Sequence, residues 1–147
     1  SFRSGSDLTG VRILSSLPTE AFVSGDALEL ELLVVNCLKN ALSAIRKNPD
    51  GKGEIHISLT SESSTTTAFW RLKVRDNGPA VSDEQFRMLA RPVASEKIEG
   101  LGLGLSISRT IAERHAARLE FTRNQPGGLA VSLCIPAADQ PHEEQTA

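Results

Sequence analysis

The sequence has little of what marks the more specialised classes of protein. Its 147 residues include no tyrosine and one tryptophan, so it lacks the aromatic side chains on which single-stranded nucleic acids stack. Its 16 basic and 18 acidic residues leave a formal net charge of −2, which excludes the strong positive field of a dedicated nucleic-acid binder or a polybasic membrane module. We therefore expect no nucleic acid and no membrane surface as partner.

Long apolar runs and cysteine clusters are missing as well. No run approaches the roughly 20 apolar residues that span a bilayer, and the opening Ser-Phe-Arg-Ser-Gly-Ser lacks the basic and apolar regions of a secretory signal. The two cysteines, Cys37 and Cys134, lie far apart, each in an apolar segment. This placement predicts buried, reduced thiols, and we expect a cytoplasmic protein.

The length and the hydrophobic content of the chain fit one compact domain with a single core. The mean hydropathy is −0.16 and 39% of the residues are hydrophobic. We expect residues 1–10 to be a disordered segment or an expression remnant, residues 11–136 to form the domain, and the polar tail, residues 137–147, to be disordered.

Apolar periodicity predicts an α+β order of elements. The expected elements are short strands at 11–14 and 21–23, a long helix at 27–47, strands at 54–59 and 70–74 flanking a Ser/Thr loop, a short helix at 82–89, a helix at 103–115 whose Leu105, Ile107, Ile111 and Ala112 face a core, and strands at 118–122 and 129–135. This order indicates a two-layer α/β sandwich with the helices on one face of a mixed, mostly antiparallel sheet. The strand order does not follow from these patterns.

The first segment with chemical potential lies in the long helix. Residues 36–41 read Asn-Cys-Leu-Lys-Asn-Ala, so Asn36 and Asn40 share one helix face, together with Ser43 and Lys47. Carboxamide oxygens on such a face can complete the shell of an Mg²⁺ ion that also holds phosphate oxygens. The alternative is a solvated polar face without function.

The second segment, Asp-Asn-Gly-Pro at residues 76–79, directly follows a predicted strand. A carboxylate in this position, Asp76, can accept a hydrogen bond from an exocyclic amino group. Gly78 beside it allows a flat ring to approach the backbone. A plain Asx turn would explain the same four residues.

The third segment, Gly-Leu-Gly-Leu-Gly-Leu at residues 100–105, opens a predicted helix. Backbone N–H groups in such a stretch can surround phosphates, and the helix N-terminus attracts anions. In a dinucleotide-binding fold the glycines follow the first strand of a βαβ unit, whereas here they follow a loop late in the chain, so that fold is excluded. A Walker loop is excluded because no Gly-Lys-Ser/Thr is present.

In this order the three segments resemble the catalytic ATP-binding domain of bacterial sensor histidine kinases. That domain belongs to the GHKL group, which includes gyrase, mismatch-repair ATPases and the ninety-kilodalton heat-shock chaperone. The resemblance covers residues 11–136 and includes the Pro-Gly-Gly at 126–128 before the last strand. It implies a fold of the GHKL (Bergerat) type and the cofactors ATP and Mg²⁺, with Asn40 on the metal and Asp76 on the adenine amino group.

The resemblance implies a larger set of site residues. Asn36 and Asn40 would serve catalysis, Asn40 would hold the metal, and the nucleotide would be bound by Lys39, Asn40, Ser43, Asp76, Gly78, Lys97, Gly100, Leu101, Gly102, Leu103, Gly104 and Leu105.

The sequence also departs from the family pattern. Ala80 replaces the second glycine of the adenine segment, and Ser43 stands where many relatives have a phosphate-binding lysine. The lid segment, residues 90–97, keeps its proline and Lys97 but has no aromatic residue, and Ala116-Ala117 replaces a glycine pair. These departures leave a second hypothesis open, in which the chain is a catalytically impaired GHKL module with a regulatory or scaffold role.

Asn36 separates the branches of the family. ATP-hydrolysing members and anti-sigma serine kinases are expected to have a glutamate here as general base, and an amide cannot take up a proton. The residue favours delivery of the γ-phosphate to a histidine. It argues against the remaining alternative, a stand-alone serine kinase or topology-type ATPase.

The phosphoacceptor is expected outside this chain. Of the three histidines, His56 lies in a predicted strand, His115 ends a predicted helix and His142 lies in the polar tail, and none resembles the family's acceptor. The resemblance therefore implies a dimerisation domain of the same kinase as partner, a response regulator downstream, and a monomer when the domain is isolated. It also implies that the chain is a fragment, either cytoplasmic or the cytoplasmic part of a membrane-bound sensor.

Overall fold

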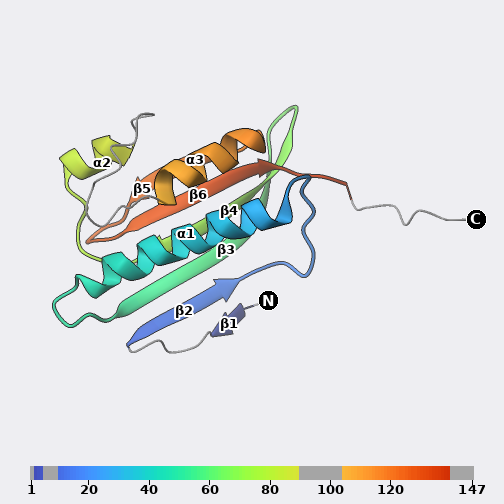
Figure 1. Cartoon of the computed structure of the whole chain (residues 1–147). Coiled ribbons are helices and arrows are strands. Elements are labelled where there is room, and N and C mark those ends of the chain that lie inside the picture. Colours follow the sequence, from blue (N-terminus) through green and yellow to red (C-terminus); the bar gives the residue numbers. More distant parts are fainter. Residues whose placement is uncertain (1, 5–9, 90–103, 140–147) are drawn as a thin grey trace, which may run out of the picture.

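The computed structural model describes residues 2–4, 10–89 and 104–139. It has two layers: α1 and α3 lie side by side across one face of a twisted sheet, and α2 lies near the end of the sheet where β5 and β6 are joined (Figure 1). The predicted α+β architecture, with the helices on one face, is confirmed.

The elements follow the predicted order. Their bounds are β1 Phe2–Ser4, β2 Val11–Ser16, α1 Ala27–Arg46, β3 Gly53–Ser63, β4 Ala68–Asp76, α2 Asp83–Leu89, α3 Gly104–Arg114, β5 Arg118–Arg123 and β6 Leu129–Pro136.

The sheet has the strand order β1-β2-β3-β4-β6-β5. Only β2 and β3 are parallel among these neighbours, because α1 connects them as a crossover and returns the chain to the same edge. The sheet is thus mixed and mostly antiparallel, as predicted. Strand β4 lies between β3 and β6, which places its last residue, Asp76, near the middle of the sheet.

Two local predictions need correction. The expected strand at 21–23 is absent: Val23 forms only an isolated bridge with Ala137, because β1 pairs with the outer edge of β2 instead. The Ser/Thr run is only partly a loop, since β3 continues to Ser63 and β4 begins at Ala68. The remaining connection is tight, and the Ser64 N–H donates to the Thr67 carbonyl at 2.8 Å.

Parts of both terminal segments pair with the domain. Phe2–Ser4 forms β1, antiparallel to β2, and so satisfies backbone groups that an edge strand would otherwise leave open. At the other end, the Ala138 N–H donates to the Phe22 carbonyl at 2.8 Å. Residues 140–147 lie outside the described part of the chain.

The core lies between α1 and the sheet. The buried residues of α1 are Leu33, Cys37, Ala41 and Ile45, a spacing of four that keeps them on one face. Both cysteines are buried and free, as predicted, and burial raises the pKa of the Cys37 thiol to about 11.

A histidine joins the start of α1 to the end of α3. The Asp26 side chain caps α1 by accepting from the Leu28 N–H at 2.9 Å, while the Asp26 N–H donates to His115 Nε2 at 2.9 Å. His115 Nδ1 lies 2.7 Å from the Ile111 carbonyl. A ring with its hydrogen on Nδ1 satisfies both bonds, so the neutral ring fits this place.

We expect His115→Ala to lower the free energy of unfolding by about 1 to 3 kcal/mol, because it removes the contacts of both ring nitrogens with Asp26 and Ile111, and each hydrogen bond contributes about 0.5 to 1.5 kcal/mol. Urea denaturation measures the change. The control is His56→Ala, which removes only a half-exposed contact with Glu54 and should cost less than about 1 kcal/mol. An equally small change in both variants would show that the His115 bridge does not stabilise the fold.

Candidate functional site

Asp76 is a buried carboxylate held in a fixed orientation at the end of β4. It is 6% exposed, and its Oδ1 accepts from the Gly78 N–H at 2.9 Å and from the Leu129 N–H at 3.4 Å. Both bonds go to Oδ1, so Oδ2 has no partner among the described residues. Burial raises the pKa of Asp76, and the two backbone hydrogen bonds oppose that rise. The site therefore presents one fixed acceptor atom.

Two glycines allow the backbone to close around Asp76. A Cβ on Gly78 would lie 3.0 Å from atoms of Ala44 in α1, so the turn after β4 rests directly on the helix. Gly128 has φ +102°, and a Cβ there would overlap the Asp76 carbonyl oxygen. In the sequence the Pro-Gly-Gly motif is only a family trait, and its tight fit against Asp76 does not follow from any local pattern.

The turn before β6 is fastened to the turn after β4. The Gly128 N–H donates to the Pro79 carbonyl at 3.2 Å, and Asn124 Nδ2 donates to the Asp76 carbonyl at 3.3 Å. These bonds join segments about 50 residues apart in the chain and position the Leu129 N–H against Asp76. A fixed carboxylate next to an open backbone turn is suited to recognise the edge of a flat, nitrogen-rich ring.

The face of α1 that carries Asn36 and Asn40 leads to this turn, because Ala44 follows Asn40 by one helical turn and contacts Gly78. Asn40 lines a small cavity between α1, α3 and the sheet. The residues around this cavity are Cys37, Asn40, Leu89, Leu105, Ser108, Leu119, Phe121, Leu129 and Val131. Asn40, Leu105 and Leu129 thus line one cavity, and Leu129 connects it to Asp76 through the hydrogen bond from its N–H.

Asn36 carries a buried, unsatisfied donor. Its Nδ2 has no hydrogen-bond partner among the described residues, and a buried polar group in that state costs about 1 to 3 kcal/mol. Such a buried donor requires a partner, which a ligand, an ordered water or a neighbouring segment can supply. The donor set of Asn36 and Asn40, two amide oxygens and two amide N–H groups, fits a phosphate group with its Mg²⁺ ion.

Arg109 was not predicted as part of the site. Its Nη2 donates to the Leu89 carbonyl at the end of α2, and its guanidinium lies 5.6 Å from the centre of the Phe121 ring. Its Nε is buried without a partner among the described residues. Arg109 therefore connects α2, α3 and β5, and no local pattern distinguishes it from a solvated arginine.

One predicted core residue of α3 is wrong. Ile107 is 44% exposed, whereas Ser108 is 3% exposed and faces the cavity. The buried positions Leu105, Ser108 and Ala112 follow the helical spacing of three and four, and Ile107 lies off that face. Apolar periodicity does not reveal a serine on the buried face, because it selects apolar side chains.

The other predicted site residues have different outcomes. Lys39 and Ser43 are exposed on α1 and do not line the cavity around Asn40. Gly104 begins α3. Lys97, Gly100, Leu101, Gly102 and Leu103 lie outside the described residues, as does the lid segment 90–97. Ala116 has φ +53° at the end of α3, where glycine is the favoured residue.

Comparison with known proteins agrees with this fold. The family described as histidine kinase-, DNA gyrase B-, and HSP90-like ATPase matches residues 25–139. The chain belongs to this family of ATPases. The predicted resemblance to the histidine kinase members is confirmed by the relatives and structures that follow.

Two curated relatives are named as kinases. Sporulation kinase B of Bacillus subtilis is 33% identical over 132 residues, which is 90% of this chain and 29% of the relative. The sensory histidine kinase/phosphatase NtrB of Salmonella typhimurium is 34% identical over 117 residues, 76% of this chain and 32% of the relative. The chain thus spans about a third or less of the length of the curated relatives that it matches.

Solved structures show the same fold. The catalytic domain of histidine kinase ThkA, in a nucleotide-free form, has a TM-score of 0.67 at 26% identity and covers 86% of this chain and 80% of that chain. The mycobacterial sensor histidine kinase MprB has a TM-score of 0.66 at 23% identity, covering 90% of this chain and 85% of that chain, which supports the fold alone. Within the described ranges, no helix is both long and apolar enough to cross a membrane.

Proposed function

We propose that this chain is the ATP-binding catalytic domain of a sensor histidine kinase, which binds Mg-ATP and delivers its γ-phosphate to a histidine on a separate dimerisation domain. The observation that carries the proposal is the arrangement of Asp76 and the two asparagines. The fixed carboxylate of Asp76 lies beside the Gly78 turn, which contacts Ala44 of α1. Asn40 lies one helical turn before Ala44, and the unsatisfied amide of Asn36 lies one turn before Asn40.

The groups have distinct roles in this proposal. Asp76 Oδ2 accepts from the adenine amino group, and Gly78 leaves room for the ring to approach the backbone. Mg²⁺, when bound, would neutralise phosphate charge, and the Asn40 oxygen would hold it. Asn36 Nδ2 donates to a phosphate oxygen, which gives the orphaned donor a partner. Leu105, at the start of α3, closes the cavity from the opposite side.

The chemistry of Asn36 supports transfer to a histidine. A hydroxyl or water nucleophile needs a general base, and a carboxamide cannot act as one. A neutral imidazole carries a free electron pair and needs no such base. Kinase activity toward histidine agrees with the names of the curated relatives.

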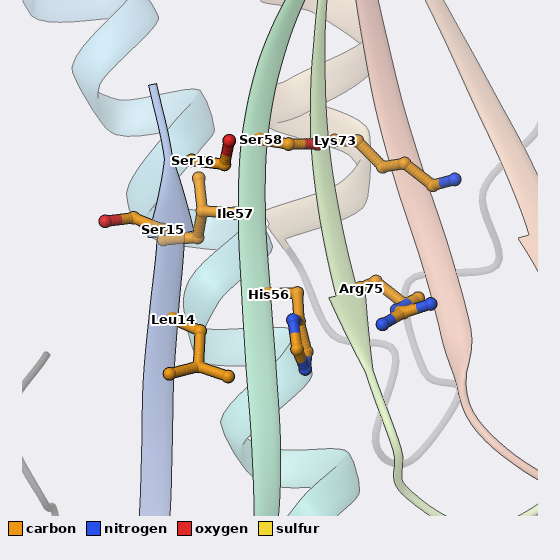
Figure 2. A pocket seen from close by; sticks show the side chains of 8 residues that line it. All are labelled: Leu14, Ser15, Ser16, His56, Ile57, Ser58, Lys73 and Arg75. Carbon is orange, nitrogen blue, oxygen red and sulfur yellow. The ribbon is translucent and has the colours of Figure 1, made fainter. Parts of the chain in front are cut away.

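The two described histidines support an acceptor elsewhere. His115 uses both ring nitrogens between Asp26 and Ile111. His56 contacts Glu54 at 3.0 Å and lies on the face of the sheet opposite the helices (Figure 2). The proposed partners are therefore a dimerisation domain with the acceptor histidine and a response regulator downstream. The proposal places this domain in the cytoplasm, where ATP is available, as a monomer when isolated.

One observation favours the second candidate, an impaired module with a regulatory role. The described residues around the Asn40 cavity include no cation, and Lys39 is exposed on α1. A phosphate chain bound there would need a positive charge from a residue outside this lining, such as Arg109, which contacts Leu89 and Phe121, or Lys97.

Calorimetric titration with ATP and GTP, with and without Mg²⁺, separates the two candidates. We expect ATP to bind more tightly than GTP, and Mg²⁺ to strengthen ATP binding. Asn40→Ala should remove that gain, because the variant lacks the amide oxygen that would hold the ion. Glu31→Ala, an exposed change on the same helix, is the control. If folded wild-type protein binds neither nucleotide at millimolar concentration, the impaired module replaces the kinase as the function.

A further inference from the structure

The helix-free face of the sheet carries a hollow that the nucleotide site does not use. It lies across β2, β3 and β4 (Figure 2), and its lining residues are Leu14, Ser15, Ser16, His56, Ile57, Ser58, Lys73 and Arg75. Successive side chains of a strand point to opposite faces. Val74 and Asp76 of β4 face the helices, so Lys73 and Arg75 face away from them.

The register explains why the surface is hollowed beside Lys73. Lys73 is directly opposite Ser58 on β3 and Ser132 on β6, and Ser58 is opposite Ser16 on β2. Serines occupy all three of these neighbouring positions, and their short side chains leave space beside the long lysine. Their hydroxyl groups can donate hydrogen bonds into that space.

Charge distinguishes Lys73 and Arg75 from the other cations on this face. Arg71 is held by Glu62 and Glu120, each at 2.8 Å, and Arg12 lies 3.3 Å from Glu54. Lys73 and Arg75 have no acidic partner in the described part of the chain. They are two residues apart on β4, a separation of about 7 Å along the strand.

The remaining charged groups around the hollow are already engaged. The His56 ring, opposite Arg75 in the register, contacts Glu54 at 3.0 Å. Glu54 lies 3.3 Å from Arg12 and 3.0 Å from His56, so it is already in contact with other partners. In a chain with a net charge of −2, the hollow thus combines two uncompensated positive charges with hydroxyl donors.

We propose that this hollow is a binding site for a phosphate monoester. A phosphate monoester carries close to two negative charges at neutral pH, which match Lys73 and Arg75, whereas a carboxylate carries one. The arginine fork binds two phosphate oxygens, and lysine contributes a point charge. Ser58 and Ser16 donate to the remaining oxygen. The ligand is either a small phosphate ester or a phosphorylated side chain, since both present the same group.

Titration of the isotopically labelled protein with phenyl phosphate, followed by NMR, tests the site. Phenyl phosphate has no adenine, so the test does not depend on the proposed kinase function. We expect saturable shifts of backbone amides in residues 14–16, 56–58 and 73–75. The double variant Lys73→Gln with Arg75→Gln should weaken the affinity by at least about tenfold, which corresponds to 1.4 kcal/mol.

A variant outside the hollow and two other ligands serve as controls for the titration. Arg118→Gln removes one charge from the same face but lies on β5, outside the hollow, and should leave the affinity within about twofold. A phosphoserine peptide that binds more tightly than phenyl phosphate identifies a phosphoprotein as the ligand, and equal affinity identifies a small ester. Acetate binding as tight as that of phenyl phosphate, shifts confined to residues 36–40 and 76–78, or an unaffected double variant would overturn the proposal.

Discussion

Asp76→Asn should weaken ATP binding by about tenfold to a hundredfold, because a hydrogen bond to a charged acceptor contributes about 1.5 to 3 kcal/mol. The asparagine oxygen can still accept from the N–H groups of Gly78 and Leu129. Its NH₂ group then occupies the position of Oδ2 and meets the adenine amino group, donor against donor. Calorimetry with ATP and GTP measures the change, and the preference for ATP should fall with the affinity.

The same variant should not lower the stability of the fold at neutral pH. Burial raises the pKa of Asp76, so the ionised form is less favourable in the fold than in the unfolded chain. The carboxyl group of Asp76 therefore contributes its full stabilisation below the pKa that it has in the unfolded chain, and this stabilisation is lost as the pH rises through its pKa in the fold. Asparagine does not ionise. The advantage of Asp76→Asn should therefore be present at pH 7 and disappear below about pH 4.

Asp83→Asn is the matched control with the opposite sign. Asp83 is fully exposed, and its ion pair with Arg123, at 2.5 Å, lowers the pKa of its carboxyl group. A carboxyl group whose pKa is lowered in the fold stabilises the protein above its unfolded pKa, and this stabilisation is lost in acid. Asp83→Asn should therefore be less stable than the wild type at neutral pH. Unchanged ATP affinity in Asp76→Asn, or a loss of stability at pH 7, would contradict the role assigned to Asp76.

Gly128→Ala should lower the free energy of unfolding by about 2 to 5 kcal/mol. A left-handed φ costs a residue with a Cβ about 1 to 2 kcal/mol, and forcing extra atoms into a packed region costs about 1 to 3 kcal/mol more. At Gly128 the added Cβ overlaps the Asp76 carbonyl oxygen. The turn that positions the Leu129 N–H must move, so ATP affinity should fall as well.

Gly51→Ala separates the two contributions. Gly51 also has a positive φ, +66°, but no atom lies within 4 Å of a Cβ built there. This variant should lose only the conformational part, about 1 to 2 kcal/mol, and keep the affinity for ATP. Urea denaturation and calorimetry on both variants measure the difference. Equal losses of stability would show that the contact with Asp76 does not constrain Gly128.

Local patterns were sufficient for most of the fold. The spacing of Leu33, Cys37, Ala41 and Ile45 reflects the period of a helix, and the alternation in β3 reflects that of a strand, because both periods arise within a few residues. The order of the three polar and glycine-rich segments was sufficient for the family, which the comparisons confirm. Predictions failed where a partner distant in sequence decides the structure, as for β1 and for the segment around Val23.

The chemistry of single residues depended on neighbours that the sequence does not reveal. Asp76 is fixed by the N–H of Leu129, 53 positions away, and Arg109 reaches the end of α2. The register pairs Arg71 with acids on two other strands, whereas Lys73 and Arg75 have no acidic partner among the described residues. The sequence by itself determined the elements and the family, because these depend on local order. Only the tertiary structure decided which donors, acceptors and charges are left without partners, because strand pairing brings distant residues together.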